Sequence, residues 1–127
     1  MKVKNEIDNI LKLHNKLLSQ GLYSFPARGK VKVSIKQGVY IIYNENGKVL
    51  HVGKTDDGKE GLNQRLYNHL TNGSSFSKKY LKVMNMNLRE VGMFKFLEVE
   101  NDRERALLEA LTIGKLCPEH LGTGVNK

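Results

Sequence analysis

Three side chains in this sequence could together move a proton and hold a phosphate group. Arg65 and His69 are four residues apart in a segment with helical periodicity, so both side chains lie on one helix face. A free tyrosine has a pKa near 10, so Tyr40 accepts a proton only if a nearby cation or hydrogen-bonded base lowers that pKa. Arg65 could supply the charge and His69 could relay the proton. The simpler alternative is a core tyrosine with two helix-surface residues.

Glu109 could supply a metal ligand. It lies in a helical segment and shares a face with apolar residues such as Ile113. A carboxylate in such surroundings is rarely buried unless it is paired or coordinates a cation. Mg²⁺ takes few protein carboxylates and keeps several waters, so one glutamate with substrate phosphate oxygens makes a plausible site. The alternative is a salt bridge to Arg65 or Arg105.

These residues cover the needs of phosphodiester cleavage: a base for water, positive charge near the phosphoryl oxygens, and stabilisation of the leaving oxygen. Their order resembles the GIY-YIG endonuclease family over residues 36–127. Gly38-Val39-Tyr40 resembles the first half of the name motif, and His51-Val52-Gly53 stands where Tyr-Ile-Gly is usual. Residues 62–69 resemble the segment that carries an essential arginine, followed one helical turn later by histidine or tyrosine. Glu109 resembles the metal-binding glutamate, and Asn126 resembles the asparagine that closes the domain.

The resemblance implies a divalent-metal-dependent DNA endonuclease in which Tyr40 is the general base and Arg65 stabilises the phosphoryl charge. His69 assists the proton transfer, Glu109 holds Mg²⁺ or Mn²⁺, and Asn126 acts near the site. His51 departs from the family pattern. An imidazole there could act as base or shuttle, could replace the tyrosine hydroxyl as a hydrogen-bond partner, or could mark a branch with lost catalysis.

The charge of the chain also favours a nucleic-acid partner. The formal net charge is +8 and the pI is about 9.6, so the surface attracts polyanions. Residues 1–35 hold seven basic and two acidic groups, which is most of the excess. The expected phosphate or DNA contacts are Arg28, Lys30, Lys32, Lys54, Lys78 and Lys79. Solvated lysine and arginine faces are common, so an ordinary surface remains the alternative.

Length and composition exclude several other classes. The 127 residues suit one compact domain, and no apolar run approaches the length of a bilayer span or a secretory signal. We therefore expect a cytoplasmic protein without a membrane partner. Cys117 and His120 have the spacing of half a zinc site, but no second pair completes it. Gly53-Lys54-Thr55 resembles the end of a phosphate-binding loop, but the spacing to the preceding glycine is wrong for one.

Periodicity predicts an α/β (α+β) fold with a three-stranded antiparallel sheet flanked by helices. An amphipathic helix over about 5–19 and an extended basic segment form an N-terminal extension, 1–35, before the nuclease-like domain, 36–127. An Asn-Gly turn joins the first two strands. Leucines at four-residue intervals indicate a helix from Leu62 to Leu70, and Asn101 and Glu104 have the spacing of a capping box at the start of the last helix. The expected elements are strands at 39–43, 49–52 and 91–99 and helices at 62–70, 75–83 and 101–116.

Two alternatives to a DNA endonuclease remain open at this point. The chain could be a catalytically inactive nucleic-acid-binding module on the same scaffold, or its substrate could be RNA. One active site cuts one strand at a time, so we expect a monomer or a DNA-dependent dimer.

Overall fold

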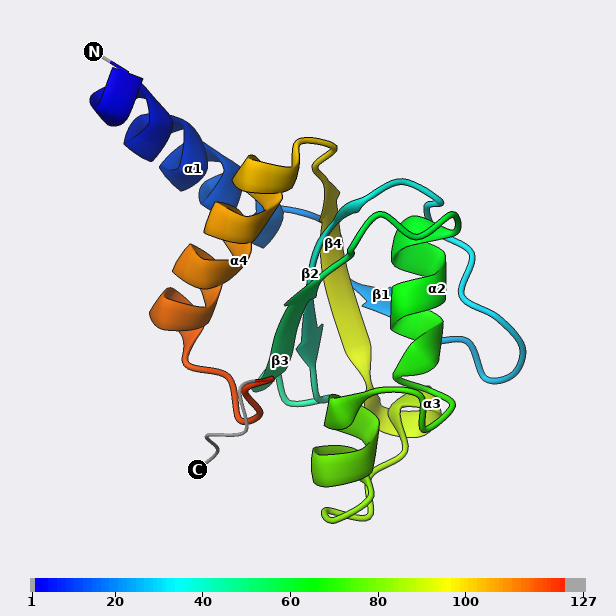
Figure 1. The fold of residues 1–127 in the computed structure, drawn as a ribbon. Coiled ribbons are helices and arrows are strands. Elements are labelled where there is room, and N and C mark those ends of the chain that lie inside the picture. Colours follow the sequence, from blue (N-terminus) through cyan, green and yellow to red (C-terminus); the bar gives the residue numbers. More distant parts are fainter. Residues whose placement is uncertain (1, 123–127) are drawn as a thin grey trace.

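A computed structural model describes residues 2–122 and places a four-stranded antiparallel sheet between two groups of helices (Figure 1). One group consists of α1 and α4, and the other contains α2, η1 and α3. In chain order the elements are α1 (Lys2–Leu18), β1 (Tyr23–Ser24), β2 (Gly38–Tyr43), β3 (Val49–Lys54), α2 (Gly61–Asn68), the π-helix η1 (Ser77–Leu81), α3 (Leu88–Val91), β4 (Met93–Glu98) and α4 (Asp102–Leu116).

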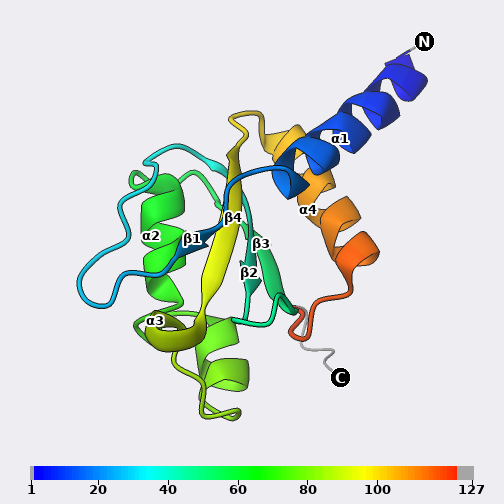
Figure 2. The same ribbon diagram turned by 180° about the vertical axis from the view of Figure 1, so that it is seen from behind.

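The predicted fold class is confirmed, with one correction to the sheet. Its strand order is β1-β4-β2-β3, so a fourth strand joins the three that were predicted. This strand has only two residues, and Tyr23 pairs with Phe94 while its ring stacks on the same side chain at 5.5 Å. Two residues are too few to produce an alternating pattern, which is why the sequence did not reveal the strand. Figure 2 shows β1 beside β4.

The central strand β2 divides the core into two clusters. Its side chains alternate between the faces of the sheet. Tyr40 and Ile42 belong to the cluster that includes residues of α2 and η1, whereas Val39 and Ile41 pack with Leu17 of α1 and with residues of α4. Both faces of β2 are covered, so its first five residues are buried without a polar position.

Residues 1–35 were predicted as an extension, and the structure packs their described part onto the rest of the protein. Helix α1 crosses α4, where His14 Nδ1 lies 2.9 Å from the hydroxyl of Thr112. In the segment after β1, Val31 is buried in the core beside α2. The side-chain oxygen of Asn63 accepts hydrogen bonds from two backbone amides of this segment, those of Val33 and Ser34.

The second half of the chain follows the predicted elements with local differences. The helix expected at 75–83 contains η1, and the first residue of the strand expected at 91–99 is the last residue of the one-turn helix α3. The capping box predicted at the start of α4 is half formed. The Asn101 side chain accepts the backbone N–H of Glu104, but the Glu104 carboxylate accepts from Asn9 of α1 instead of returning to Asn101. None of the helices in the described residues combines the length and apolar composition needed to cross a bilayer.

Candidate active site

The pairing of β2 with β3 sets the position of Tyr40. Tyr40 lies directly opposite Gly53, and its ring passes over that glycine. A Cβ atom on Gly53 would lie 2.3 Å from the Tyr40 hydroxyl oxygen, so no larger residue fits without moving the ring. Gly38 is restricted in the same way by β4, because a Cβ there would lie 2.2 Å from the carbonyl oxygen of Leu97. Gly38 and Gly53 are therefore both required to be glycine, because neighbouring atoms leave no room for a Cβ.

Helix α2 brings two of the predicted site residues to Tyr40. His69 follows the last residue of α2 and keeps helical dihedral angles, and its Nε2 lies 2.6 Å from the Tyr40 hydroxyl oxygen. Burial raises the pKa of Tyr40 above its ordinary value, while the Arg65 guanidinium opposes that rise. Burial is the larger effect, so Tyr40 keeps its proton in the free protein. The nearby cation is present as the sequence predicted, but it does not make Tyr40 a base by itself.

His69 is a neutral imidazole in this site. Its pKa is lowered, first by burial and then by the nearby charges of His51, Arg65 and His120. Its second ring nitrogen, Nδ1, lies 2.7 Å from the hydroxyl oxygen of Ser74, a residue that precedes η1. Tyr40, His69 and Ser74 therefore form a continuous hydrogen-bonded chain from the sheet to the segment before η1.

His51 lies on β3 between aromatic rings. Its ring stacks on Phe76 with centroids 4.6 Å apart, and its Nδ1 lies 3.1 Å from Nδ1 of His120. Burial, followed by the neighbouring His120, lowers the pKa of His51 to about 3. This imidazole is therefore neutral at pH 7, and the partner that the structure gives it is another histidine, His120.

His120 belongs to the buried group around His51, which its sequence context does not indicate. By spacing His120 and Cys117 form half of a metal site, but Cys117 is exposed and His120 is buried against His51. The backbone N–H of His120 donates to the carbonyl oxygen of Leu50, and Glu119 donates in the same way to Val49. These bonds fix the segment after α4 along β3. No spacing rule connects residues 51 and 120, so only the fold reveals the pair.

An irregularity in β3 lies next to this contact. His51 pairs with Ile42 and Val49 pairs with Tyr43, so Leu50 has no partner in the ladder. A bulge of this kind bends the strand and redirects the neighbouring side chains. Leu50 is packed in the same core cluster as Phe76, and its carbonyl oxygen is the one that receives His120.

Glu109 of α4 lies close enough to Tyr40 and Arg65 for their charges to interact. Burial raises the pKa of its carboxyl group, Asp56 raises it further, and the cations Lys54 and Arg65 oppose this rise. Within residues 2–122, Glu109 forms no ion pair or hydrogen bond. Lys54 instead donates to Asp56.

Arg105, one turn before Glu109, does not neutralise that carboxylate. Its buried guanidinium donates to the carbonyl oxygens of Thr55, Val99 and Glu100 and to the carboxylates of Asp57 and Asp102. The salt bridge from Glu109 to Arg105, which the sequence left open, is not formed. Arg105 holds the loop after β3, which carries Asp56, against α4.

The donor set around Glu109 fits a hard divalent cation. A half-buried carboxylate without a partner is costly, and a bound cation would remove that cost. Mg²⁺ binds through one or two carboxylates together with waters and phosphate oxygens. Glu109 is the first such ligand, and Asp56 offers oxygen atoms nearby. No cluster of three metal-ligating side chains occurs in the part of the chain that the structure describes, so substrate and water would have to complete the coordination.

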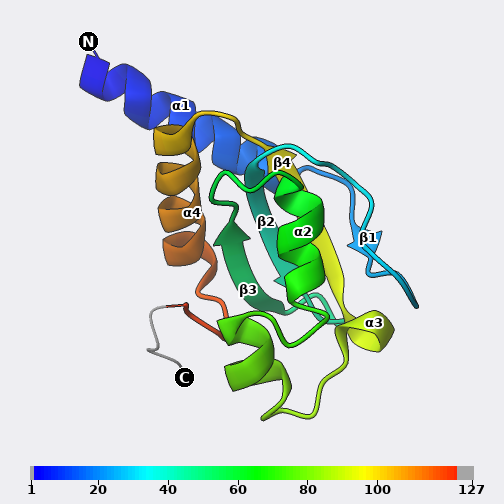
Figure 3. The ribbon, with the colours of Figure 1, turned by 45° about the vertical axis from the view of Figure 1, so that its right-hand side comes forward.

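The remaining predicted residues that the structure describes lie outside this cluster. Figure 3 shows the segment between β1 and β2, which carries Arg28, Lys30 and Lys32, on the side of α2 that faces away from α4. All three cations are exposed. Lys78 and Lys79 are exposed on η1, and Lys79 is close enough to His120 to lower the pKa of that imidazole, after burial. Asn126 lies outside the described residues.

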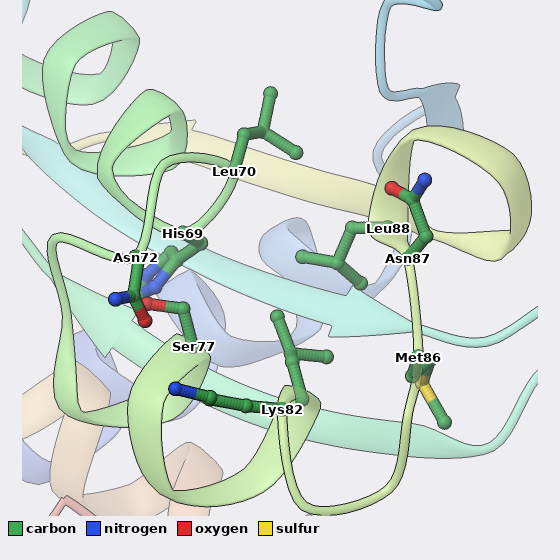
Figure 4. Close-up of a pocket in the computed structure, with 9 residues that line it drawn as sticks. His69, Leu70, Asn72, Ser77, Lys82, Met86, Asn87 and Leu88 are labelled. Carbon is green, nitrogen blue, oxygen red and sulfur yellow. The ribbon is translucent and has the colours of Figure 1, made fainter.

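Two cavities border the site. One of about 370 Å³ opens beside Asp56 and Arg65 and continues along the polar face of α2 past Gln64 and Asn68. The other, of about 330 Å³, lies between α2, η1 and α3, and both His69 and Ser77 line it (Figure 4). Arg65 is exposed and lines the first cavity.

The fold agrees with the comparison with known proteins. A sequence model of the GIY-YIG catalytic domain matches residues 36–121. The chain belongs to the GIY-YIG family, whose members are endonucleases that generally use divalent metal ions. UvrABC system protein C of Finegoldia magna is 34% identical over 89 residues, which are 70% of this chain and 13% of that protein. The chain therefore spans only a small part of this relative. No solved structure matches the chain.

Proposed function

We propose that this protein is a divalent-metal-dependent endonuclease that hydrolyses DNA phosphodiester bonds, acting as a monomer or a DNA-dependent dimer. The observation that supports this most is the 2.6 Å contact between Tyr40 and His69, formed beside the cation of Arg65 and the unpaired carboxylate of Glu109. A base, a phosphate-binding cation and a metal ligand are then available at one place.

The proton transfer begins with Tyr40 and His69. Tyr40 carries its proton in the free protein, so it becomes a base only as that proton moves to Nε2 of His69. The phenol oxygen then takes a proton from the attacking water, whose oxygen forms the new bond to phosphorus. The bond from phosphorus to the leaving 3′ oxygen breaks, and that oxygen takes up a proton from solvent. A substrate phosphate near His69 favours the step, because its negative charge stabilises the imidazolium.

Arg65 binds the phosphoryl oxygens in this proposal, since a guanidinium makes paired hydrogen bonds to phosphate. Lys54 would be a second cation at the phosphoryl oxygens once bound substrate breaks the salt bridge between Lys54 and Asp56. Glu109, with Asp56 beside it, would hold Mg²⁺ or Mn²⁺. Such an ion polarises the phosphate and stabilises the charge that develops on the leaving oxygen.

The net charge of +8 supports a nucleic-acid substrate, since cations that neutralise phosphates provide most of the non-specific affinity. Lys78 and Lys79 are exposed on η1, and Lys79 acts electrostatically on His120. We propose that these two residues contact the DNA backbone close to the cut. Arg28, Lys30 and Lys32 would contact a more distant part of the backbone, beyond α2.

The test compares nicking of supercoiled plasmid in Mg²⁺, Mn²⁺ and EDTA, with single-stranded DNA and RNA as further substrates at one fixed salt concentration. Wild type is expected to nick DNA only with metal, and Glu109→Gln to lose at least a hundredfold in rate while still binding DNA in EDTA. Glu90→Gln removes one exposed carboxylate on α3 and serves as the control. Binding without cleavage in either metal would overturn the enzyme assignment, and cleavage of RNA alone would overturn the DNA assignment.

A further inference from the structure

Ser74 lies at the far end of the chain that starts at Tyr40, and its hydroxyl oxygen has three neighbours. It accepts a hydrogen bond from the backbone N–H of Ser77 at 3.1 Å, in the manner of a residue that caps a helix. It lies 2.7 Å from Nδ1 of His69 and 3.1 Å from the hydroxyl oxygen of Ser77. Which groups donate in the last two contacts decides the state of His69.

The hydroxyl of Ser77 bears on this question. It lies 2.9 Å from the backbone carbonyl oxygen of Ser74, which can only accept, so Ser77 uses its single hydrogen there. If the 3.1 Å contact between the two hydroxyl groups is a hydrogen bond, Ser74 is therefore its donor. Its one hydrogen then points to Ser77, which leaves lone pairs toward His69. The hydrogen in the contact with His69 then belongs to Nδ1 of the imidazole.

We propose that Ser74 is a positioning residue that holds His69 in the tautomer with hydrogen on Nδ1, so that Nε2 is free to take the proton of Tyr40. This inference rests on the proposed function for its catalytic meaning, but the tautomer itself can be observed in any folded sample. A neutral histidine carries hydrogen on one nitrogen only, and the partner of the other nitrogen decides which one. Without Ser74, Nε2 could carry the hydrogen and could not receive a second one.

The surroundings of His69 favour a neutral ring in which the tautomer matters. The groups that face it are Tyr40 from β2, His51 from β3, Arg65 from α2 and His120 from the segment after α4. Burial together with three of these, His51, Arg65 and His120, acts against a charged imidazole. Ser77 lines the same cavity as His69, so one of the two hydroxyl groups next to the ring borders a space open to water (Figure 4).

The first test observes the ring directly. Long-range ¹H–¹⁵N correlation spectra of the free protein distinguish the two neutral tautomers by the chemical shifts of Nδ1 and Nε2. Wild-type His69 is expected to carry its hydrogen on Nδ1. Ser74→Ala is expected to shift the population toward Nε2–H, and Ser74→Thr, which keeps a hydroxyl group and caps a helix nearly as well, to restore Nδ1–H. Wild-type His69 with hydrogen on Nε2 would overturn the inference.

The second test measures metal-dependent nicking. Ser74→Ala is expected to lower kcat about tenfold with little change in KM, the size of effect that one neutral hydrogen bond supports. Asn87→Ala is the control for a lost helix cap, because the Asn87 side chain accepts the backbone N–H of Arg89 and does not contact His69. An equal loss in both variants would mean a structural effect only and would overturn the positioning role. If wild type does not cut, the proposed function fails, whereas the tautomer measurement still decides the role of Ser74.

Discussion

Gly53→Ala tests whether the close approach of Tyr40 to β3 determines activity. The new Cβ would lie 2.3 Å from the phenol oxygen and 2.5 Å from the carbon that bears it, whereas ordinary contacts begin at 3.4 Å. The ring must therefore move by about 1 Å, which changes the length and direction of the 2.6 Å contact between the Tyr40 hydroxyl and His69. A misplacement of this size costs about a hundredfold in kcat, and the overpacking costs about 1–3 kcal/mol of stability.

Gly114→Ala is the matched control, since a Cβ there meets no atom within 4 Å. Gly114 lies on an exposed part of α4, so alanine should raise stability by about 0.5–1 kcal/mol and leave the nicking rate unchanged. The assays are single-turnover nicking of plasmid DNA and urea unfolding. If Gly53→Ala acts by displacing the hydroxyl, then adding Tyr40→Phe should cause little further loss, although Tyr40→Phe alone is severe. A folded Gly53→Ala protein with the wild-type rate would refute the reasoning.

Two further predictions concern stability and pH. All four histidines have a pKa below the ordinary value in the fold, so the unfolded chain binds more protons below about pH 6.5, and stability must fall as the pH is lowered. His51, with a pKa of about 3, should account for a loss of roughly 2–3 kcal/mol in the free energy of unfolding between pH 6.5 and 4.5. If the stability of His51→Asn, measured by urea unfolding, falls with pH as steeply as that of wild type, this prediction is contradicted. The carboxyl pKa of Glu109 is raised, so its charge destabilises the fold as the pH rises above the ordinary value near 4.3. Without metal, the Tm of Glu109→Gln should therefore exceed that of wild type at pH 7 but not at pH 4. Added Mg²⁺ should raise the Tm of wild type and not that of the variant. Equal melting temperatures of the two proteins at pH 7 without metal would count against a desolvated carboxylate.

The sequence was sufficient for the elements with strong local signals. The Asn-Gly turn, the leucines at four-residue intervals and the Asn101 cap each depend on neighbours a few residues away, and the structure has the hairpin, α2 and α4 at those places. The spacing of Arg65 and His69 indicates one helix face, and in the structure both residues lie near Tyr40. Local periodicity therefore positions most of the cluster, because helix and strand geometry relate residues close in sequence.

The rest depended on contacts between distant parts of the chain. Strand β1 forms because Tyr23 meets Phe94, and His51 meets His120 across 69 positions. The tyrosine pKa could not be read from the sequence either, because it depends on how deeply the ring is buried, and that burial outweighs the nearby arginine. No sequence pattern indicates a role for Ser74, because the proposed role depends on where the single hydrogen of the Ser77 hydroxyl group points.

The backbone bonds from residues 119 and 120 to β3 also affect how the protein behaves at high concentration. An exposed strand edge is a template for pairing with another chain, and β3 forms one edge of this sheet. The amides of Glu119 and His120 occupy the carbonyl oxygens of Val49 and Leu50, and the opposite edge is only two residues long. At high concentration, the molecules would therefore present little free edge at these positions for pairing with a strand of another molecule.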